Sequence, residues 1–134
     1  MAEKLRILLS KVGLDGHDRG IRVIETALRK AGMDVFYSGL HQTAPAIAQL
    51  AREKKVHVVA VSSLTGAHLT IFPAVVQALK DEGLADVHVI GGGIVPAPDH
   101  PKLRACGVGK MFEPGATTNE IVEYLQTWFR TRRR

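Results

Sequence analysis

A fivefold alternation of apolar runs and amphipathic segments is the feature that most constrains the fold. Short runs rich in branched residues predict strands at 5–9, 34–37, 56–61, 87–90 and 108–112. Helical spacing of apolar residues predicts helices at 21–31, 44–53, 69–82, 101–106 and 118–129. Because the run 56–61 is apolar on both faces, it belongs in the middle of a parallel sheet. We therefore expect an α/β fold with a flavodoxin-like (Rossmann-like), doubly wound sheet of five parallel strands in the order 2-1-3-4-5.

The length of the chain limits what it can do alone. With 134 residues, of which 46% are hydrophobic and 23% charged, we expect one soluble domain over 1–134 that is too small to form a cleft between two domains. The net charge is +5, but four arginines lie in a basic C-terminal tail at 130–134, which leaves +1 on the rest. Aromatic residues make up only 5%, so we expect no nucleic-acid partner. The tail is either a frayed end or a contact for an acidic partner.

The expected location is the cytoplasm. Cys106 is the only cysteine, which excludes an intramolecular disulfide and suits a reducing compartment, and we expect it to be a small core residue rather than a reactive thiol. Residues 1–4 lead straight into a strand-like run, with no signal peptide. No apolar stretch approaches the roughly 20 residues that span a bilayer, so we expect no membrane association.

Ligands of such a sheet bind at the carboxyl ends of its strands, at the switch point between the first and third strands. The loops predicted there are 11–20, 62–68, 91–98 and 113–117, which are the richest in Gly, Ser and His. The first loop places Asp15 and His17 two residues apart, with Lys11 shortly before them. A carboxylate behind an imidazole fixes its tautomer for metal binding, and a lysine keeps that carboxylate ionised. The alternative is a polar turn in which Asp18 or a neighbour caps the next helix.

A metal cage made by this protein alone is disfavoured, because such sites need three or four converging ligands. His57 and His88 lie at strand starts, on the opposite edge of the sheet from His17. A single histidine instead suits a metal that is already held by a macrocycle. The small residues at 62–66 and 91–93 leave room for a bulky group, although the three glycines also fit a tight turn.

Two other functions of this fold fit poorly. A phosphoryl-accepting receiver domain needs an aspartate at the end of the third strand, where Ser62 and Ser63 stand. A dinucleotide fold needs Gly-x-Gly-x-x-Gly in the first turn, whereas the glycines here are Gly13, Gly16 and Gly20. Binding of a flavin or nucleotide in the same crevice is a further alternative, but it leaves the presence of Asp15 and His17 unexplained.

Three motifs, Asp15-x-His17-x-x-Gly20, Ser62-x-Leu64 and Gly91-Gly92, resemble the cobalamin-binding domain of coenzyme-B12-dependent acyl-CoA mutases, and the resemblance extends from Arg6 to about Tyr124. The resemblance implies that His17 is the lower axial ligand of cobalt, in place of the cofactor's own base, with Asp15 and Lys11 as a relay behind it. The displaced nucleotide tail would enter a slot formed by residues of the second and third motifs. The segment 112–117 resembles a Phe-Gly-Pro-Gly-Thr segment of the family, from which it departs at Glu113 and Ala116. The cofactor-binding residues implied are Asp15, Gly16, His17, Asp18, Arg19, Gly20, Ile24, Ser62, Leu64, Gly66, Gly91, Gly92, Glu113, Gly115 and Thr117.

The function that the resemblance implies is that of a small mutase subunit, an isomerase component that binds adenosylcobalamin. A large TIM-barrel subunit would hold the acyl-CoA, of the 2-hydroxyisobutyryl or methylmalonyl type, for radical carbon-skeleton rearrangement. The segment 37–41 resembles the 2-hydroxyisobutyryl branch. The alternatives are a corrinoid methyl carrier, which normally has a helical cap before the first strand, a cobalamin sensor module, or an unrelated ligand binder.

Overall fold

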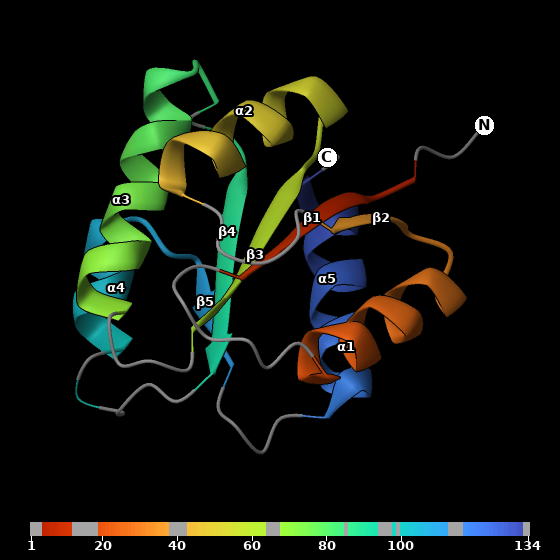
Figure 1. Cartoon of the computed structure of the whole chain (residues 1–134). Coiled ribbons are helices and arrows are strands. Elements are labelled where there is room, and N and C mark those ends of the chain that lie inside the picture. Colours follow the sequence, from red (N-terminus) through yellow and green to blue (C-terminus); the bar gives the residue numbers. More distant parts are fainter. Residues whose placement is uncertain are drawn as a thin grey trace.

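The computed structural model describes residues 4–11, 19–37, 43–63, 68–84, 86–93, 98, 100–112 and 117–132. In these ranges strands and helices alternate (Figure 1). The strands are β1 (Arg6–Lys11), β2 (Asp34–Tyr37), β3 (Val58–Ser63), β4 (His88–Gly93) and β5 (Lys110–Met111). The helices are α1 (Arg19–Lys30), α2 (Ala44–Lys54), α3 (His68–Asp81), α4 (His100–Cys106) and α5 (Thr118–Arg132).

The sheet is parallel throughout the described pairings, in the order β2-β1-β3-β4-β5. This confirms the predicted fold class and strand order. The central strand β3 contributes Val58, Val59 and Val61 as buried residues on both faces of the sheet, as its continuous apolar sequence predicted.

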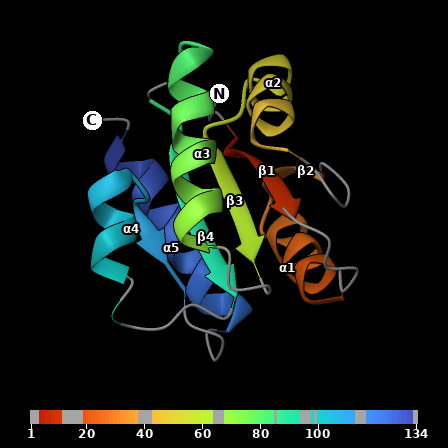
Figure 2. The same cartoon turned by 60° about the vertical axis from the view of Figure 1, so that its left-hand side comes forward.

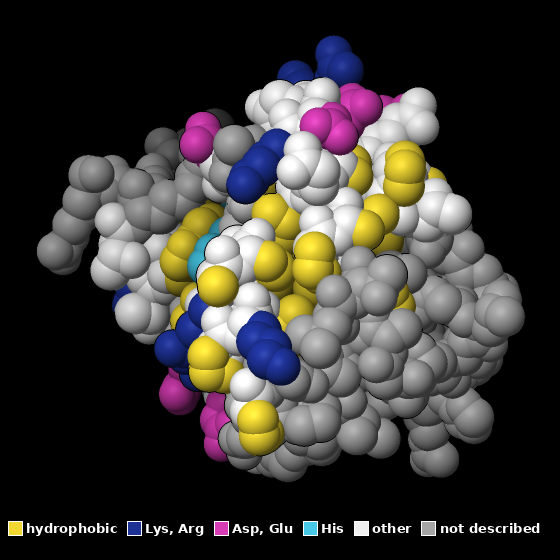
Figure 3. Space-filling view, turned by 90° about the vertical axis from the view of Figure 1, so that its left-hand side faces the viewer, with side chains coloured by type: hydrophobic (Ala, Val, Ile, Leu, Met, Phe, Trp, Pro, Cys, Tyr) yellow, Lys and Arg dark blue, Asp and Glu magenta, His cyan; other side chains and the backbone are white. Residues whose placement is uncertain are grey.

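Helices cover both faces of the sheet (Figures 1 and 2). On one face, which we call the α2–α4 face, a core cluster around Phe72 packs beneath α2, α3 and α4. On the other, the α1/α5 face, a second cluster includes Leu28 of α1 and Leu125 of α5. Seen from the side of α3 and α4, hydrophobic, basic and acidic side chains are interspersed among the described residues (Figure 3).

Helix ends follow local backbone chemistry. The Thr43 hydroxyl caps α2 by accepting a hydrogen bond from the Ala46 amide at 3.3 Å. Gly32, at φ 90°, follows the last turn of α1 in the left-handed conformation that its position predicted. Lys55 adopts the same left-handed region, at φ 53°, after α2.

Three strands run further than the apolar runs predicted. β1 reaches Lys11, β3 includes Ser62 and Ser63, and β4 includes Gly91 to Gly93, so residues expected in loops are strand residues. Parallel pairing uses backbone groups, so serine and glycine can continue the ladder although they favour strands less than valine does. In contrast β5 is shorter than its predicted range, and α5 continues to Arg132, so Arg130 to Arg132 belong to a helix rather than to a frayed tail.

Candidate cofactor-binding site

Strand register brings three of the predicted site residues into one row. Lys11 is paired with Ser62 across β1 and β3, and Ser62 with Gly92 across β3 and β4. The row lies at the carboxyl ends of these strands, next to the switch point, where the connection after β1 leads to β2 on one side and the connection after β3 leads to β4 on the other. Arg19 and Gly20 form the start of α1, directly after the loop that carries the Asp15 and His17 motif.

Part of the predicted site is outside the described residues. This applies to Asp15, Gly16, His17, Asp18, Leu64, Gly66, Glu113 and Gly115. Within the described ranges, no three His, Cys, Asp or Glu side chains gather around one point, and no helix is long and apolar enough to cross a membrane.

A cavity of about 90 Å³ lies between the sheet and the helices α1 and α5. We call it the α1/α5 slot; its lining residues are Ile7, Leu9, Ile24, Leu28, Ala60, Val61, Ile90, Gly91, Gly92, Phe112 and Ile121. Three of these, Ile24, Gly91 and Gly92, were predicted as cofactor contacts. The slot extends from the fully buried Ile7 and Leu28 to the half-buried Gly92, and its lining is mostly apolar.

Two of the three glycines of β4, Gly91 and Gly92, lack a side chain for different reasons. A Cβ added to Gly91 would lie 2.5 Å from two ring carbons of Phe72 and 2.7 Å from the sulfur of Met111, on the α2–α4 face. A Cβ on Gly92 would meet only the carbonyl oxygen of Phe112 among the described atoms, at 4.0 Å. Gly91 is therefore required by core packing, whereas Gly92 leaves open space at the α1/α5 slot.

One wall of the slot is held by a group of aromatic rings that the sequence did not single out. The amide of Phe112 donates to the carbonyl of Gly91 at 2.8 Å, and the Phe112 ring meets the Tyr124 ring edge-on, with centroids 5.5 Å apart. The Tyr124 hydroxyl lies 2.7 Å from Nε2 of His88, which also stacks on Trp128 at 4.6 Å. Tyr124 and Trp128 stand four apart on α5, a helical spacing that is the only sequence signal for this group.

Burial changes the titration of this pair. Desolvation lowers the pKa of His88 below its usual 6.5. Desolvation also raises the pKa of Tyr124 above 10.0, and the positive charge of Arg104 opposes this more weakly. Both shifts favour the neutral forms of the two groups, and a neutral imidazole can either donate to the phenol oxygen or accept from its proton.

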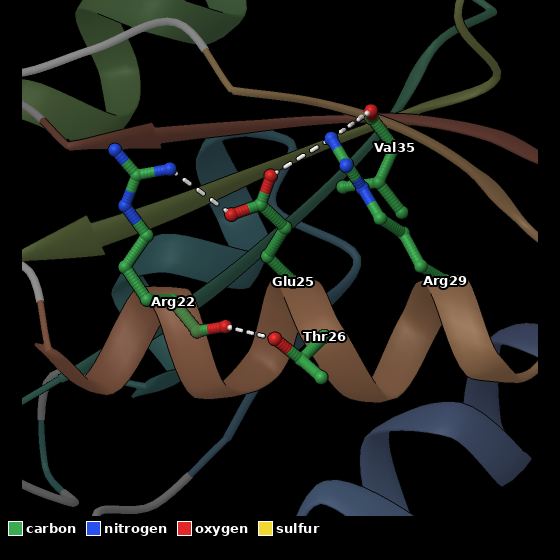
Figure 4. Close-up of polar contacts among 5 residues, drawn as sticks. All are labelled: Arg22, Glu25, Thr26, Arg29 and Val35. Carbon is green, nitrogen blue, oxygen red and sulfur yellow. Dashed lines mark hydrogen bonds and ion pairs between the residues drawn. The ribbon is translucent and has the colours of Figure 1, made fainter.

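The other wall, α1, is fixed against the edge strand β2 by the half-buried carboxylate of Glu25 (Figure 4). Glu25 accepts from Arg22 at 3.1 Å and pairs with Arg29 at 2.8 Å. Arg29 also donates to the carbonyl of Val35 at 3.1 Å, and the Arg22 guanidinium lies 4.2 Å from the centroid of the Tyr37 ring. These contacts place Ile24, which lines the slot, relative to the sheet.

Thr117 has a structural partner as well as its predicted cofactor role. Its hydroxyl accepts from the Glu120 amide at 3.1 Å, and the Glu120 carboxylate accepts from the Thr117 amide at 3.4 Å. This reciprocal pair is a capping box, which starts α5 beside the slot. The Thr117 hydroxyl keeps its own proton and a second lone pair for another partner.

Comparison with known families agrees with this arrangement. Residues 5–123 match the family described as the B12 binding domain. The chain belongs to this B12-binding family. The match begins just before β1 and ends within α5, so it includes every described strand and all the lining residues of the slot in the B12-binding chain.

Two relatives of the B12-binding chain match it over most of their own lengths. The pivalyl-CoA mutase small subunit of Xanthobacter autotrophicus is 49% identical over 119 residues, covering 89% of this chain and 80% of the relative. The 2-hydroxyisobutanoyl-CoA mutase small subunit of Aquincola tertiaricarbonis is 42% identical over 123 residues, covering 92% and 90%. Both relatives are mutase subunits, so the chain belongs with the subunits of isomerases.

The fold of the B12-binding chain also has a solved counterpart. The crystal structure of a cobalamin-binding protein from Desulfitobacterium hafniense superposes with a TM-score of 0.80 at 26% identity, covering 94% of this chain and 60% of that one. The similarity agrees with the flavodoxin-like arrangement found here.

Proposed function

We propose that this chain, acting as a single domain, is the cobalamin-binding small subunit of a cytoplasmic acyl-CoA mutase. Its match to two mutase small subunits over 80% and 90% of their lengths supports this proposal. The observation that carries the binding role is the α1/α5 slot, with the open side of Gly92 at its half-buried end.

The residues of the slot fit the nucleotide tail of cobalamin. A flat aromatic base loses its hydration on entering an apolar slot and gains contacts with aliphatic and aromatic side chains, here those of Ile24, Phe112 and Ile121. The space that a Cβ at position 92 would take is left for the tail. A tail held in this slot would be kept away from the cobalt, and a protein side chain would be free to bind the metal instead.

In this proposal His17 would bind the cobalt of the cofactor, and Asp15 and Lys11 would act as the relay behind it. The position of Lys11 at the end of β1, in register with Ser62, supports a site that forms where the strands end. The start of α1 at Arg19 holds the other end of the same loop. The chemistry that adenosylcobalamin supplies when bound is homolysis of its cobalt–carbon bond, which starts a radical rearrangement. The role of this chain is to hold the cofactor and set the strength of the axial bond.

The partner in this proposal is a large TIM-barrel subunit that binds the acyl-CoA. The names of the small-subunit relatives, with pivalyl-CoA and 2-hydroxyisobutanoyl-CoA as substrates, favour a short branched acyl-CoA over the methylmalonyl type. Selection between such substrates belongs to the pocket that surrounds the acyl group, on the partner.

Electron paramagnetic resonance of the full chain with cob(II)alamin tests the axial ligand. With ¹⁵N-labelled histidine, we expect nitrogen hyperfine splitting of the cobalt signal to change to the pattern of one ¹⁵N nucleus. The splitting should be lost in His17→Ala and kept in His100→Ala, because position 100 begins α4 on the opposite face of the sheet. A splitting that is unchanged in His17→Ala contradicts the assignment.

Turnover separates the mutase from the alternatives. We expect the chain, reconstituted with adenosylcobalamin and a large mutase subunit, to rearrange branched acyl-CoAs. A chain that instead passes a methyl group from methylcobalamin to an acceptor is a corrinoid carrier, and a chain that binds cobalamin without either activity is a sensor or storage protein.

A further inference from the structure

His88 is held from three directions at the start of β4. Its ring stacks on Trp128 with an angle of 15° between the planes, and its Nε2 lies 2.7 Å from the Tyr124 hydroxyl. On the remaining side the backbone of Gly109 lies so close to the imidazole that a Cβ at this position would collide with the ring. Glycine is therefore required at position 109. The imidazole thus contacts both α5 and the segment that leads into β5.

Both of these elements meet at Phe112, which lines the slot. The backbone of Phe112 follows β5 directly and is fixed by its hydrogen bond to the Gly91 carbonyl. Its ring is held by the edge-on contact with Tyr124, at an angle of 86° between the planes. Ile121, which also lines the slot, lies one turn before Tyr124 on α5. Tyr124 itself is not among the lining residues.

We propose that Tyr124 is a positioning residue for corrinoid selection, because its hydroxyl on His88 and its ring against Phe112 set the width of the α1/α5 slot. The inference rests on the proposed function, in which this slot receives the nucleotide tail. Tyr124 acts on the tail only through Phe112 and Ile121, and therefore favours corrinoids that carry a tail over those that lack one.

A comparison of two corrinoids tests this role without reference to turnover. Aquocobalamin carries the nucleotide tail, and diaquocobinamide shares its corrin ring but has no tail. Binding of each to the full chain is followed by visible absorption and by calorimetry. We expect Tyr124→Leu, which removes both the ring and the hydroxyl, to weaken aquocobalamin binding roughly tenfold and to leave diaquocobinamide binding unchanged. Tyr124→Phe keeps the ring contact with Phe112, and should restore most of the preference for the tailed corrinoid.

Trp128→Leu is the matched control, because Trp128 stacks on the same imidazole but does not line the slot. It should lower the unfolding temperature and leave the ratio of the two affinities unchanged. Equal weakening of both corrinoids by Tyr124→Leu, or an equal loss of preference in Trp128→Leu, overturns the positioning role of Tyr124. A wild-type chain that binds neither corrinoid overturns the proposed function itself.

Discussion

Gly91 packs so closely against Phe72 that a Cβ at position 91 would lie 2.5 Å from two carbons of the ring. Any side chain at this position must therefore displace the Phe72 ring. Phe72 is fully buried on the α2–α4 face and has little freedom to move. The next residue, Gly92, faces the opposite layer, because successive strand residues alternate between the two faces of a sheet. Two adjacent glycines of one motif therefore serve different purposes.

Alanine at each glycine separates these purposes. Gly91→Ala should lower the free energy of unfolding by about 1–3 kcal/mol, the usual cost of overpacking a core. Gly92→Ala should leave that free energy within about 0.5 kcal/mol of wild type but weaken binding of cobalamin, since the new methyl group occupies slot space. Urea unfolding and corrinoid titration measure the two effects. A Gly91→Ala chain as stable as wild type contradicts the packing argument.

Removal of the Glu25 carboxylate should loosen α1 from β2. We expect Glu25→Ala to lower the free energy of unfolding by about 1 kcal/mol at low salt, because Arg22 and Arg29 lose a common partner. The difference in the free energy of unfolding between the variant and wild type should shrink at high salt, because salt screens the partly exposed ion pairs that Glu25 makes in the wild type. Glu53→Ala, at an exposed position of α2, is the control and should have little effect. An equal effect of both variants at every salt concentration argues against this role of Glu25.

The capping box of α5 predicts that the hydroxyl of Thr117 contributes to the free energy of unfolding. Thr117→Ala should lower the free energy of unfolding by about 1 kcal/mol, because the Glu120 amide loses its acceptor. Thr117→Ser keeps the hydroxyl and should unfold like wild type. If alanine and serine are equivalent in urea unfolding, the hydroxyl does not cap the helix.

The lowered pKa of His88 predicts a pH dependence of stability. In the folded chain His88 stays neutral at pH values where the unfolded chain already binds a proton, so the unfolded state carries more protons. Stability should therefore rise with pH between the lowered folded pKa and 6.5, and should be lost progressively as the pH falls through this window. The variant His88→Gln lacks this contribution. The difference in the free energy of unfolding between wild type and this variant should therefore change with pH below 6.5 and become constant above it. A constant difference across the window argues against a proton effect of His88.

The sequence predicted a parallel sheet because alternating strands and helices are joined by right-handed crossovers, and it placed the run 56–61 in the middle because that run is apolar on both faces. The predicted ends of β1, β3 and β4 came too early in the sequence. Hydrophobicity marks the buried part of a strand, whereas backbone hydrogen bonds continue the strand beyond it. Ser62 and Gly92 were found as site residues, but only pairing showed that they share a row with Lys11.

The aromatic wall was harder to predict. His88 was recognised at a strand start, but its contact with Tyr124 joins residues 36 apart in sequence, and Gly109 supplies the room for its ring. Such contacts depend on how α5 lies over the sheet, which periodicity does not specify. The same holds for Arg29, whose bond to the Val35 carbonyl depends on the path of the chain between α1 and β2.

The walls of the slot come from opposite ends of the chain, α1 at Arg19–Lys30 and α5 at Thr118–Arg132. During synthesis the first wall and the strands β1, β3 and β4 leave the ribosome well before the second wall does. A chain that ends before α5 therefore keeps α1 and these strands but lacks Ile121 and the helix that covers this side of the slot. Cofactor binding should therefore require α5, and proteolytic removal of this helix should abolish it.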